Sequence, residues 1–204
     1  MARPNRKITD ILEAPFVWRF FRKIIDVFGG IYRKRMMILR GFGLTPQTSV
    51  IDIACGTGQY SQLTKADYLG IDMDANYVAD AQKRFGNARR KFICADANRA
   101  SIDDSSYEAA ILIDATHHLM DEENRALFIT LNKVASKMVV ICDPIQQSRS
   151  NLIGRFLTSL DRGKYIRPGE ALLALIQESM RVEKIEKTKL MGVEGLCILA
   201  RPKK

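Results

Sequence analysis

The stretch that carries the clearest chemistry runs from residue 49 to residue 61 and reads Ser-Val-Ile-Asp-Ile-Ala-Cys-Gly-Thr-Gly-Gln-Tyr-Ser. Its apolar beginning, Val50–Ile53, predicts a β-strand that leads into a loop built on Gly56 and Gly58, and a helix is expected to start near Gln59. Glycine lets the backbone turn sharply and lets a ligand approach it closely. A strand, a glycine turn and a helix N-terminus together hold nucleotide-like cofactors. The stretch therefore predicts a cofactor site.

Asp52 indicates which kind of cofactor this loop suits. It lies inside the predicted strand, shortly before Gly56, where a carboxylate would repel the pyrophosphate of a dinucleotide. A dinucleotide-binding loop also has a third glycine, and Ser61 stands at that position. S-adenosylmethionine carries an ammonium group and a sulfonium group and no phosphate, so a nearby carboxylate suits it. The loop therefore favours S-adenosylmethionine, with S-adenosylhomocysteine as its product.

The same stretch resembles the first motif of the class I S-adenosylmethionine-dependent methyltransferases. That motif has the form Asp-x-x-x-Gly-x-Gly, which Asp52, Gly56 and Gly58 match. A plain strand and turn of another α/β protein is the alternative. The resemblance covers residues 45–144 well and the ends of the chain loosely. One departure is that the family often has Lys-Pro-Gly-Gly before its fifth strand, where residues 135–137 read Ala-Ser-Lys, so a tighter or different turn is expected there.

Acidic residues follow the next two predicted strands, where ligands of an open α/β sheet bind. The resemblance implies that Asp72 accepts hydrogen bonds from the ribose hydroxyls and that Asp96 meets the adenine amino group. Asp74 is expected to cap the next helix. The other cofactor contacts that the resemblance implies are Ala54, Met73 against the adenine, the backbone of Ala97, and Asp114.

After the fourth predicted strand, residues 114–121 read Asp-Ala-Thr-His-His-Leu-Met-Asp. This resembles the His-His-Leu-x-Asp segment of many bacterial small-molecule methyltransferases. Methyl transfer is an in-line displacement on a sulfonium, so the protein mainly positions the nucleophile, and a base helps when that nucleophile is a hydroxyl or a protonated amine. Histidine suits this role at neutral pH. We predict His117 as the catalytic residue and His118 as structural; the alternative is that both are structural.

The resemblance implies a substrate-covering insertion over residues 146–170, and a basic segment, residues 161–168, falls within it. Its Arg162, Tyr165 and Arg167 are candidates to clamp an anionic group of the acceptor, and a solvated basic loop is the alternative. Tyr32 is a further candidate to close over the site.

The formal net charge is +9, and much of the positive charge lies before residue 45. This asymmetry indicates an anionic partner, with solubility alone as the alternative. We predict methyl transfer to a small-molecule acceptor. An RNA methyltransferase is one alternative, and a membrane-surface lipid or quinone methyltransferase is another, because aromatic and basic residues interleave over residues 16–23 as in an interfacial helix. A non-catalytic cofactor-binding protein is the remaining alternative.

The cysteines and carboxylates do not indicate a metal site. None of the four cysteines is paired at metal-ligand spacing, which predicts reduced thiols in a cytoplasmic protein. Asp114 and Asp143 could supply two carboxylates, but two carboxylates alone are weak evidence for a metal site, and no metal is predicted. No apolar run reaches the roughly 18 residues of a membrane span, so at most peripheral membrane association is expected.

These residues need a sheet to position them. Strands that alternate with helices predict a doubly wound, mostly parallel, Rossmann-like α/β sheet, and two closing β-like runs around Gly192 predict an antiparallel C-terminal hairpin. Seven strands and a helical cap are what the resemblance adds. The predicted domains are an N-terminal cap over residues 1–45 and a methyltransferase domain over residues 46–204. The predicted strands are 50–53, 68–71, 91–95, 109–113, 138–142, 182–187 and 195–200, and the predicted helices are 15–28, 31–40, 59–64, 75–85, 122–135, 151–160 and 168–180.

Overall fold

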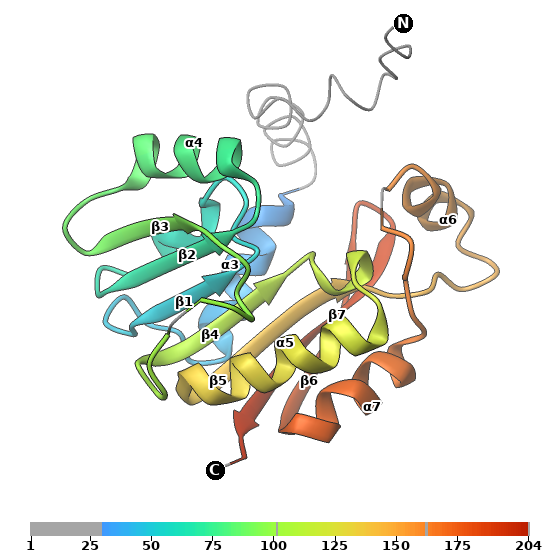
Figure 1. Cartoon of the computed structure of the whole chain (residues 1–204). Helices are drawn as coiled ribbons and strands as arrows, with labels where there is room; N and C mark the ends of the chain where they lie inside the picture. The colour runs from blue at the N-terminus through green and yellow to red at the C-terminus, as the bar shows by residue number, and fades with distance from the viewer. Residues whose placement is uncertain (1–29, 101, 162, 204) are drawn as a thin grey trace, which may run out of the picture.

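The computed structural model describes residues 30–100, 102–161 and 163–203. Its centre is one seven-stranded sheet in the order β3-β2-β1-β4-β5-β7-β6 (Figure 1). The first five strands pair in parallel, and β7 pairs antiparallel with both β5 and β6. This arrangement confirms the predicted fold class. The strands are β1 (Val50–Ile53), β2 (Tyr68–Asp72), β3 (Arg90–Cys94), β4 (Tyr107–Ile113), β5 (Ala135–Pro144), β6 (Met180–Leu190) and β7 (Val193–Pro202).

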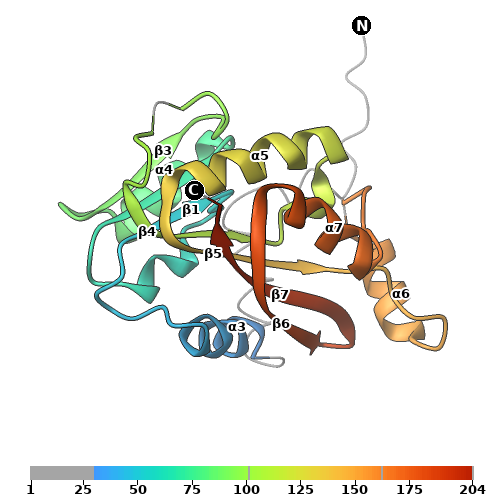
Figure 2. The same ribbon diagram turned by 90° about the horizontal axis from the view of Figure 1, so that it is seen from below.

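Helices cover both faces of the sheet. Helices α5 and α7 pack side by side on one face, and α3 lies on the other (Figures 1 and 2). The predicted helix over residues 15–28, and the aromatic residues within it, lie outside the described residues. The described helices are α3 (Ile31–Gly41), the short 3₁₀ helix η1 (Gln59–Leu63), α4 (Ala75–Phe85), the 3₁₀ turn η2 (Thr116–His118), α5 (Asp121–Val134), α6 (Leu152–Ser159) and α7 (Gly169–Ser179).

The alternation of side chains along β1 divides the core into two layers. Ile51 and Ile53 pack toward α5 and α7, whereas Val50 packs in the layer that includes Met36 and Leu39 of α3. All four residues of β1 are buried, as expected for a parallel strand with helices on both faces. Helix α3 therefore shares its core with the sheet, and the boundary placed between a cap and a domain at residue 45 stays a prediction.

The connection from α5 to β5 and the hairpin between β6 and β7 both agree with the sequence prediction, whereas the ends of β6 and β7 do not. Helix α5 ends at Val134 and β5 begins at Ala135, so the tighter connection expected there is confirmed. The hairpin turns at Met191 and Gly192, which have φ of 49° and 88°, the signs that a two-residue type I′ turn requires. Strands β6 and β7 run several residues beyond the predicted ranges. The reason is that β6 is an edge strand, and its backbone ladder continues although most of its side chains are polar and exposed.

Candidate cofactor and acceptor site

The loop after β1 depends on glycine at two positions. Gly56 has φ of 53° and Gly58 has φ of 72°, both in the left-handed region that glycine enters without strain. A Cβ at Gly58 would also come within 3.0 Å of the Phe92 ring and of Ala81, whereas a Cβ at Gly56 would have no neighbour within 4 Å. Gly58 is therefore required for packing as well as for the turn, and the backbone at Gly56 is open to close approach by a ligand.

Ala54 takes the same left-handed conformation without being glycine, with φ of 58°. We expect Ala54→Gly to raise the free energy of unfolding by about 1 kcal/mol, because a Cβ in this region costs about that much and Ala54 is exposed. Urea unfolding of both proteins measures the difference. The matched control is Ala126→Gly on the exposed side of α5, which should instead lose about 1 kcal/mol. A loss of stability in both variants would show that Ala54 is not strained.

Asp72, at the end of β2, is fastened to this loop. Its carboxylate accepts hydrogen bonds from the backbone N–H of Gly56 at 2.8 Å and of Asp74 at 2.9 Å. Each carboxylate oxygen has a second lone pair, so the group can still accept from a ligand. Asp74 caps α4 by accepting from the N–H groups of Asn76 and Tyr77, as predicted.

The end of β3 brings the next carboxylate to the same edge. Asp72 pairs in parallel register with Cys94, so Asp96 follows β3 close to the point where β2 ends. Asp96 accepts from the N–H of Asn98 at 2.9 Å and lies 3.4 Å from Arg99. Ala97 is buried in the core, which leaves its backbone as the group that a ligand could contact. Met73, by contrast, is 75% exposed beside Asp72.

Asp52 lies beneath the loop rather than on its surface. It is 1% exposed and accepts a hydrogen bond of 2.5 Å from the Tyr68 hydroxyl. Burial raises the pKa of Tyr68 well above its usual value, and the Asp52 charge raises it further, so the phenol stays a donor. Asp52 is therefore shielded from direct contact with a ligand, and its role at the predicted cofactor site stays a prediction.

Arg35 of α3 forms the contact that sequence reasoning missed. Both of its terminal nitrogens donate to the carboxylate of Asp114, which follows β4 with φ of 55°. The Arg35 side chain is only 12% exposed and that of Asp114 is 33% exposed, so the pair is largely shielded from water. Tyr32, one turn before Arg35, donates to the carbonyl of Gln59 at 2.6 Å. The signal in the sequence was the spacing of Tyr32 and Arg35, which places both on one face of the helix.

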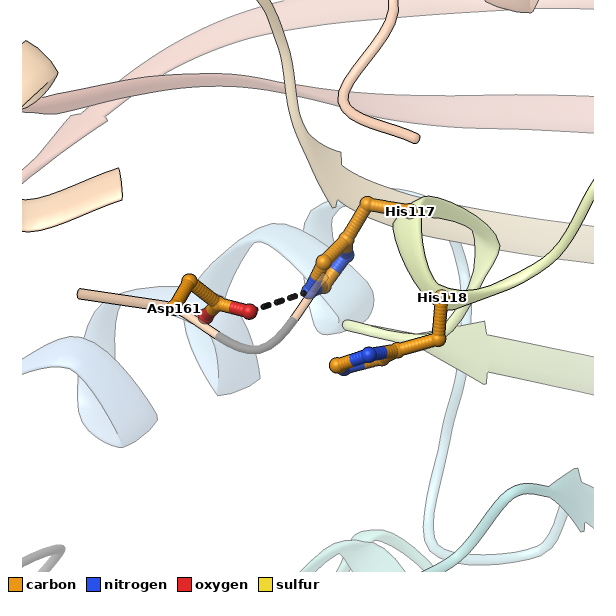
Figure 3. Close-up of side chains that lie close together, drawn as sticks. All are labelled: His117, His118 and Asp161. Carbon is orange, nitrogen blue, oxygen red and sulfur yellow. Dashed lines mark ion pairs between the residues drawn. The ribbon is translucent and has the colours of Figure 1, made fainter. Parts of the chain in front are cut away.

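The η2 turn after β4 buries one histidine and exposes the other. His117 is 3% exposed; its Nδ1 lies 3.0 Å from Asp143 Oδ1 and its Nε2 lies 3.4 Å from Asp161 Oδ1. Figure 3 shows Asp161 facing the His117 ring, with the exposed His118 ring beside it. Burial by itself lowers the pKa of His117, but hydrogen bonds to Asp143 and Asp161 outweigh burial and raise the pKa to about 10. In this arrangement His117 holds a proton between two carboxylates, and its role as a catalytic base stays a prediction.

The predicted insertion is tied to this turn. Arg167 donates from its Nε and from both terminal nitrogens, so its guanidinium is fully engaged. Its partners are the Asp121 carboxylate and the carbonyls of Thr116, Leu119 and Tyr165. The backbone N–H of Tyr165 also donates to the His117 carbonyl at 3.0 Å. Arg167 therefore fastens the insertion to η2, where the sequence predicted an anion clamp; Arg162 lies outside the described residues.

A sequence profile of the methyltransferase domain matches residues 50–137, which run from the start of β1 into β5. The chain carries a methyltransferase domain, and its fold is that of the class I S-adenosylmethionine-dependent methyltransferases. The matched range holds the glycine loop, the carboxylates after β2, β3 and β4, and the η2 turn. No curated protein sequence matches this chain.

Solved structures share the fold of this methyltransferase domain at low sequence identity. Geranyl diphosphate C-methyltransferase from Streptomyces coelicolor A3(2) is 11% identical, with a TM-score of 0.70 over 85% of this chain and 80% of that one. Magnesium protoporphyrin IX methyltransferase from Synechocystis PCC 6803 is 16% identical, with a TM-score of 0.66 over 99% and 90%. A putative methyltransferase from Bacillus halodurans is 12% identical, with a TM-score of 0.64 over 84% and 98%. The first two were solved with S-adenosylhomocysteine bound.

S-adenosylmethionine is the cofactor of this class of methyltransferase, and features of the loop edge fit it. The backbone at Gly56 is open, Met73 is exposed beside Asp72, and the carboxylate of Asp72 retains lone pairs for hydroxyl donors. The hydroxyl of Thr57, inside the same loop, is buried and has no hydrogen-bond partner among the described residues. These groups offer the cofactor space, an apolar contact and hydrogen-bond acceptors.

Proposed function

We propose that this methyltransferase transfers the methyl group of S-adenosylmethionine to a small-molecule acceptor. The observation that carries the proposal is the convergence of the glycine loop with Asp72 and Asp96 at the carboxyl ends of three neighbouring parallel strands. This is the edge of an open α/β sheet at which ligands bind, and β1 lies at the point where the strand order reverses.

The proposed cofactor contacts are those that the resemblance to the family implies, and the arrangement of this edge is compatible with them. Asp72 takes the ribose hydroxyls, Met73 packs against the adenine, and Asp96 with the backbone of Ala97 meets the adenine edge. The loop from Ala54 to Gly58 lies against the methionine part, whose ammonium and sulfonium the Asp52 charge favours. Asp114 lies at the end of β4, where Arg35 holds its carboxylate.

Methyl transfer from S-adenosylmethionine requires little acid–base catalysis by the protein. The sulfonium leaves as a neutral thioether, so alignment of the acceptor with the methyl group supplies most of the effect. We propose that the η2 turn and the insertion enclose the acceptor, with Tyr32 and Tyr165 at the boundary. His117 would act as a base toward the acceptor only after its Nε2 has lost its proton and its contact with Asp161 has opened.

Calorimetric titration with S-adenosylhomocysteine tests the proposal. We expect one site with a dissociation constant in the micromolar range, about −8 kcal/mol of binding free energy. Absence of binding to correctly folded protein would contradict it. After binding is established, acceptors can be screened by the formation of S-adenosylhomocysteine.

A specific observation on α6 supports a second candidate, an enzyme that works at a membrane surface on a lipid or quinone. Four exposed residues of this segment fall within about 100° of the helix circumference: Leu152, Ile153, Phe156 and Leu160, each more than 60% exposed. The opposite side of α6 faces the protein through Gly154, where a Cβ would strike Gln147 and the carbonyl of Gly192.

The surroundings of this apolar stripe are basic, which suits an anionic membrane surface. Arg149 and Arg155 are exposed beside it, and α6 lies at one end of the molecule, next to the β6–β7 hairpin (Figures 1 and 2). An amphipathic helix of this kind lies in the interface plane. Within the part of the chain that the structure describes, no helix has the length and apolarity to span a membrane.

Co-sedimentation with phosphatidylcholine vesicles that contain phosphatidylglycerol tests this candidate. We expect Leu152→Ser combined with Phe156→Ser to lower the partition coefficient more than tenfold, because burial of each side chain in the interface contributes about 1.5 kcal/mol or more. Ile129→Ser, at an equally exposed position on α5, should leave it unchanged. Failure of the unmodified protein to sediment with these vesicles would exclude the candidate.

A further inference from the structure

Three side chains that can bind a metal converge on one point between the η2 turn and the insertion. One ligand atom each from His117, His118 and Asp161 lie within 4.8 Å of one another (Figure 3). We propose that these three residues bind one divalent transition-metal cation, and that Zn²⁺ is the ion that two imidazoles and one carboxylate fit best. This site does not depend on which acceptor the enzyme uses, but while the cation is bound the Nε2 atom of His117 is a ligand and cannot also serve as a base.

The strongest support is the contact of Asp143 with Nδ1 of His117, the ring nitrogen that does not face the proposed ion. This nitrogen lies 3.0 Å from Asp143, and Asp143 is 3% exposed and also accepts a hydrogen bond from the Thr116 hydroxyl. A carboxylate on Nδ1 fixes the ring orientation and places the proton on that nitrogen, which leaves Nε2 as the ligand atom. Such carboxylate–histidine–metal arrangements orient most metal-binding histidines. Asp143 thus supplies the outer contact that a metal site requires.

The spacing of the inner atoms also matches a coordination sphere. Two ligands at 2.0–2.1 Å from a tetrahedral zinc ion lie about 3.3 Å apart. His117 Nε2 and Asp161 Oδ1 lie 3.4 Å apart, which is longer than the usual charge-assisted hydrogen bond of about 2.7–2.9 Å. A ring nitrogen of the exposed His118 lies within 4.8 Å of the other two ligand atoms and completes the set.

The chain passes unusually close to this point. A Cβ at Gly163 would lie 2.0 Å from the His117 ring and 3.1 Å from Asp161, so only glycine lets the insertion approach here. A cation would therefore bind two segments, η2 and the insertion, that the contacts of Arg167 and Tyr165 already join. Three protein ligands would leave the fourth position of the ion to water.

The sequence predicted no metal, because its pattern offered only Asp114 and Asp143 as candidate carboxylates. The structure pairs Asp114 with Arg35 and places Asp143 behind His117, so neither is the inner ligand. Asp161 takes that role because the insertion returns to the η2 turn, which no local spacing indicated.

The test is a titration of chelator-treated protein with Zn²⁺ by calorimetry and with Co²⁺ by visible absorption. We expect one ion per chain, and affinity at least tenfold weaker in His118→Ala and in Asp161→Asn. Both residues are exposed, so these variants should fold. Asp103→Asn, a matched exposed aspartate before β4, should bind like the unmodified protein. Zn²⁺ should also slow proteolysis within residues 146–170 in the unmodified protein and not in Asp161→Asn.

Two results would overturn the proposal. The first is absence of binding to folded protein, and the second is equal affinity in the unmodified protein, His118→Ala and Asp161→Asn, which would place the ion elsewhere. Titration with S-adenosylhomocysteine is a separate measurement, so loss of the cation site would leave the proposed methyl transfer standing.

Discussion

Replacing Asp72 with alanine should weaken S-adenosylhomocysteine binding by at least tenfold. A hydrogen bond from a hydroxyl to a charged acceptor contributes about 1.5–3 kcal/mol, and every 1.4 kcal/mol is a factor of ten in affinity. The same carboxylate accepts from the N–H of Gly56, so its removal should also loosen the loop against which we propose the cofactor lies. Calorimetric titration of the two proteins, each shown to be folded by circular dichroism, measures the ratio.

Asp74→Ala is the matched control, because it removes a carboxylate two residues away. Asp74 caps α4, so its loss should cost about 1 kcal/mol of stability. The affinity for S-adenosylhomocysteine should stay within a factor of two. Equal weakening in the two variants would mean that the segment is sensitive to any change, and unaltered binding in Asp72→Ala would remove Asp72 from the cofactor site.

Asp114→Ala should lower the free energy of unfolding by about 3 kcal/mol. Arg35 would then be left largely buried without its bidentate partner, and removal of one member of a shielded ion pair costs about 3–5 kcal/mol. The lower end applies because Asp114 itself is partly exposed. Urea unfolding gives the difference, and cofactor affinity can be measured on the same sample.

The variant Arg35→Met distinguishes the contribution of the Arg35 charge to the free energy of unfolding from the contribution of its apolar contacts. Methionine keeps much of the apolar stem that α3 buries, and the Asp114 left behind can bind water, so the expected loss is about 1 kcal/mol. The double variant Arg35→Met with Asp114→Ala should be more stable than Asp114→Ala alone, because no charge stays buried. Losses that simply add would show that the pair has no coupling and that α3 is held by its apolar contacts alone.

Local signals account for what the sequence predicted well. The helix over residues 75–85 was placed with its capping aspartate, because a side-chain cap and the spacing of apolar residues act within a few residues of one another. The glycine loop was recognised for the same reason, since its φ values and its close approach are local requirements. Strand ends were less accurate. The ladder between β6 and β7 continues through polar residues whose pairing depends on the neighbouring strand.

The amino-acid sequence by itself determined the class of fold and the residues that follow each strand at the edge where we propose the cofactor binds, because these follow from alternation and turns. Only the tertiary structure decided how distant side chains pair. Arg35 meets Asp114 across 79 residues, and His117 lies between Asp143 and Asp161. Arg167, predicted to meet a ligand, is occupied by the η2 turn. Such pairs form where the packing of helices and strands brings charged side chains together in places that are largely shielded from solvent. The packing of the whole core decides where those places are.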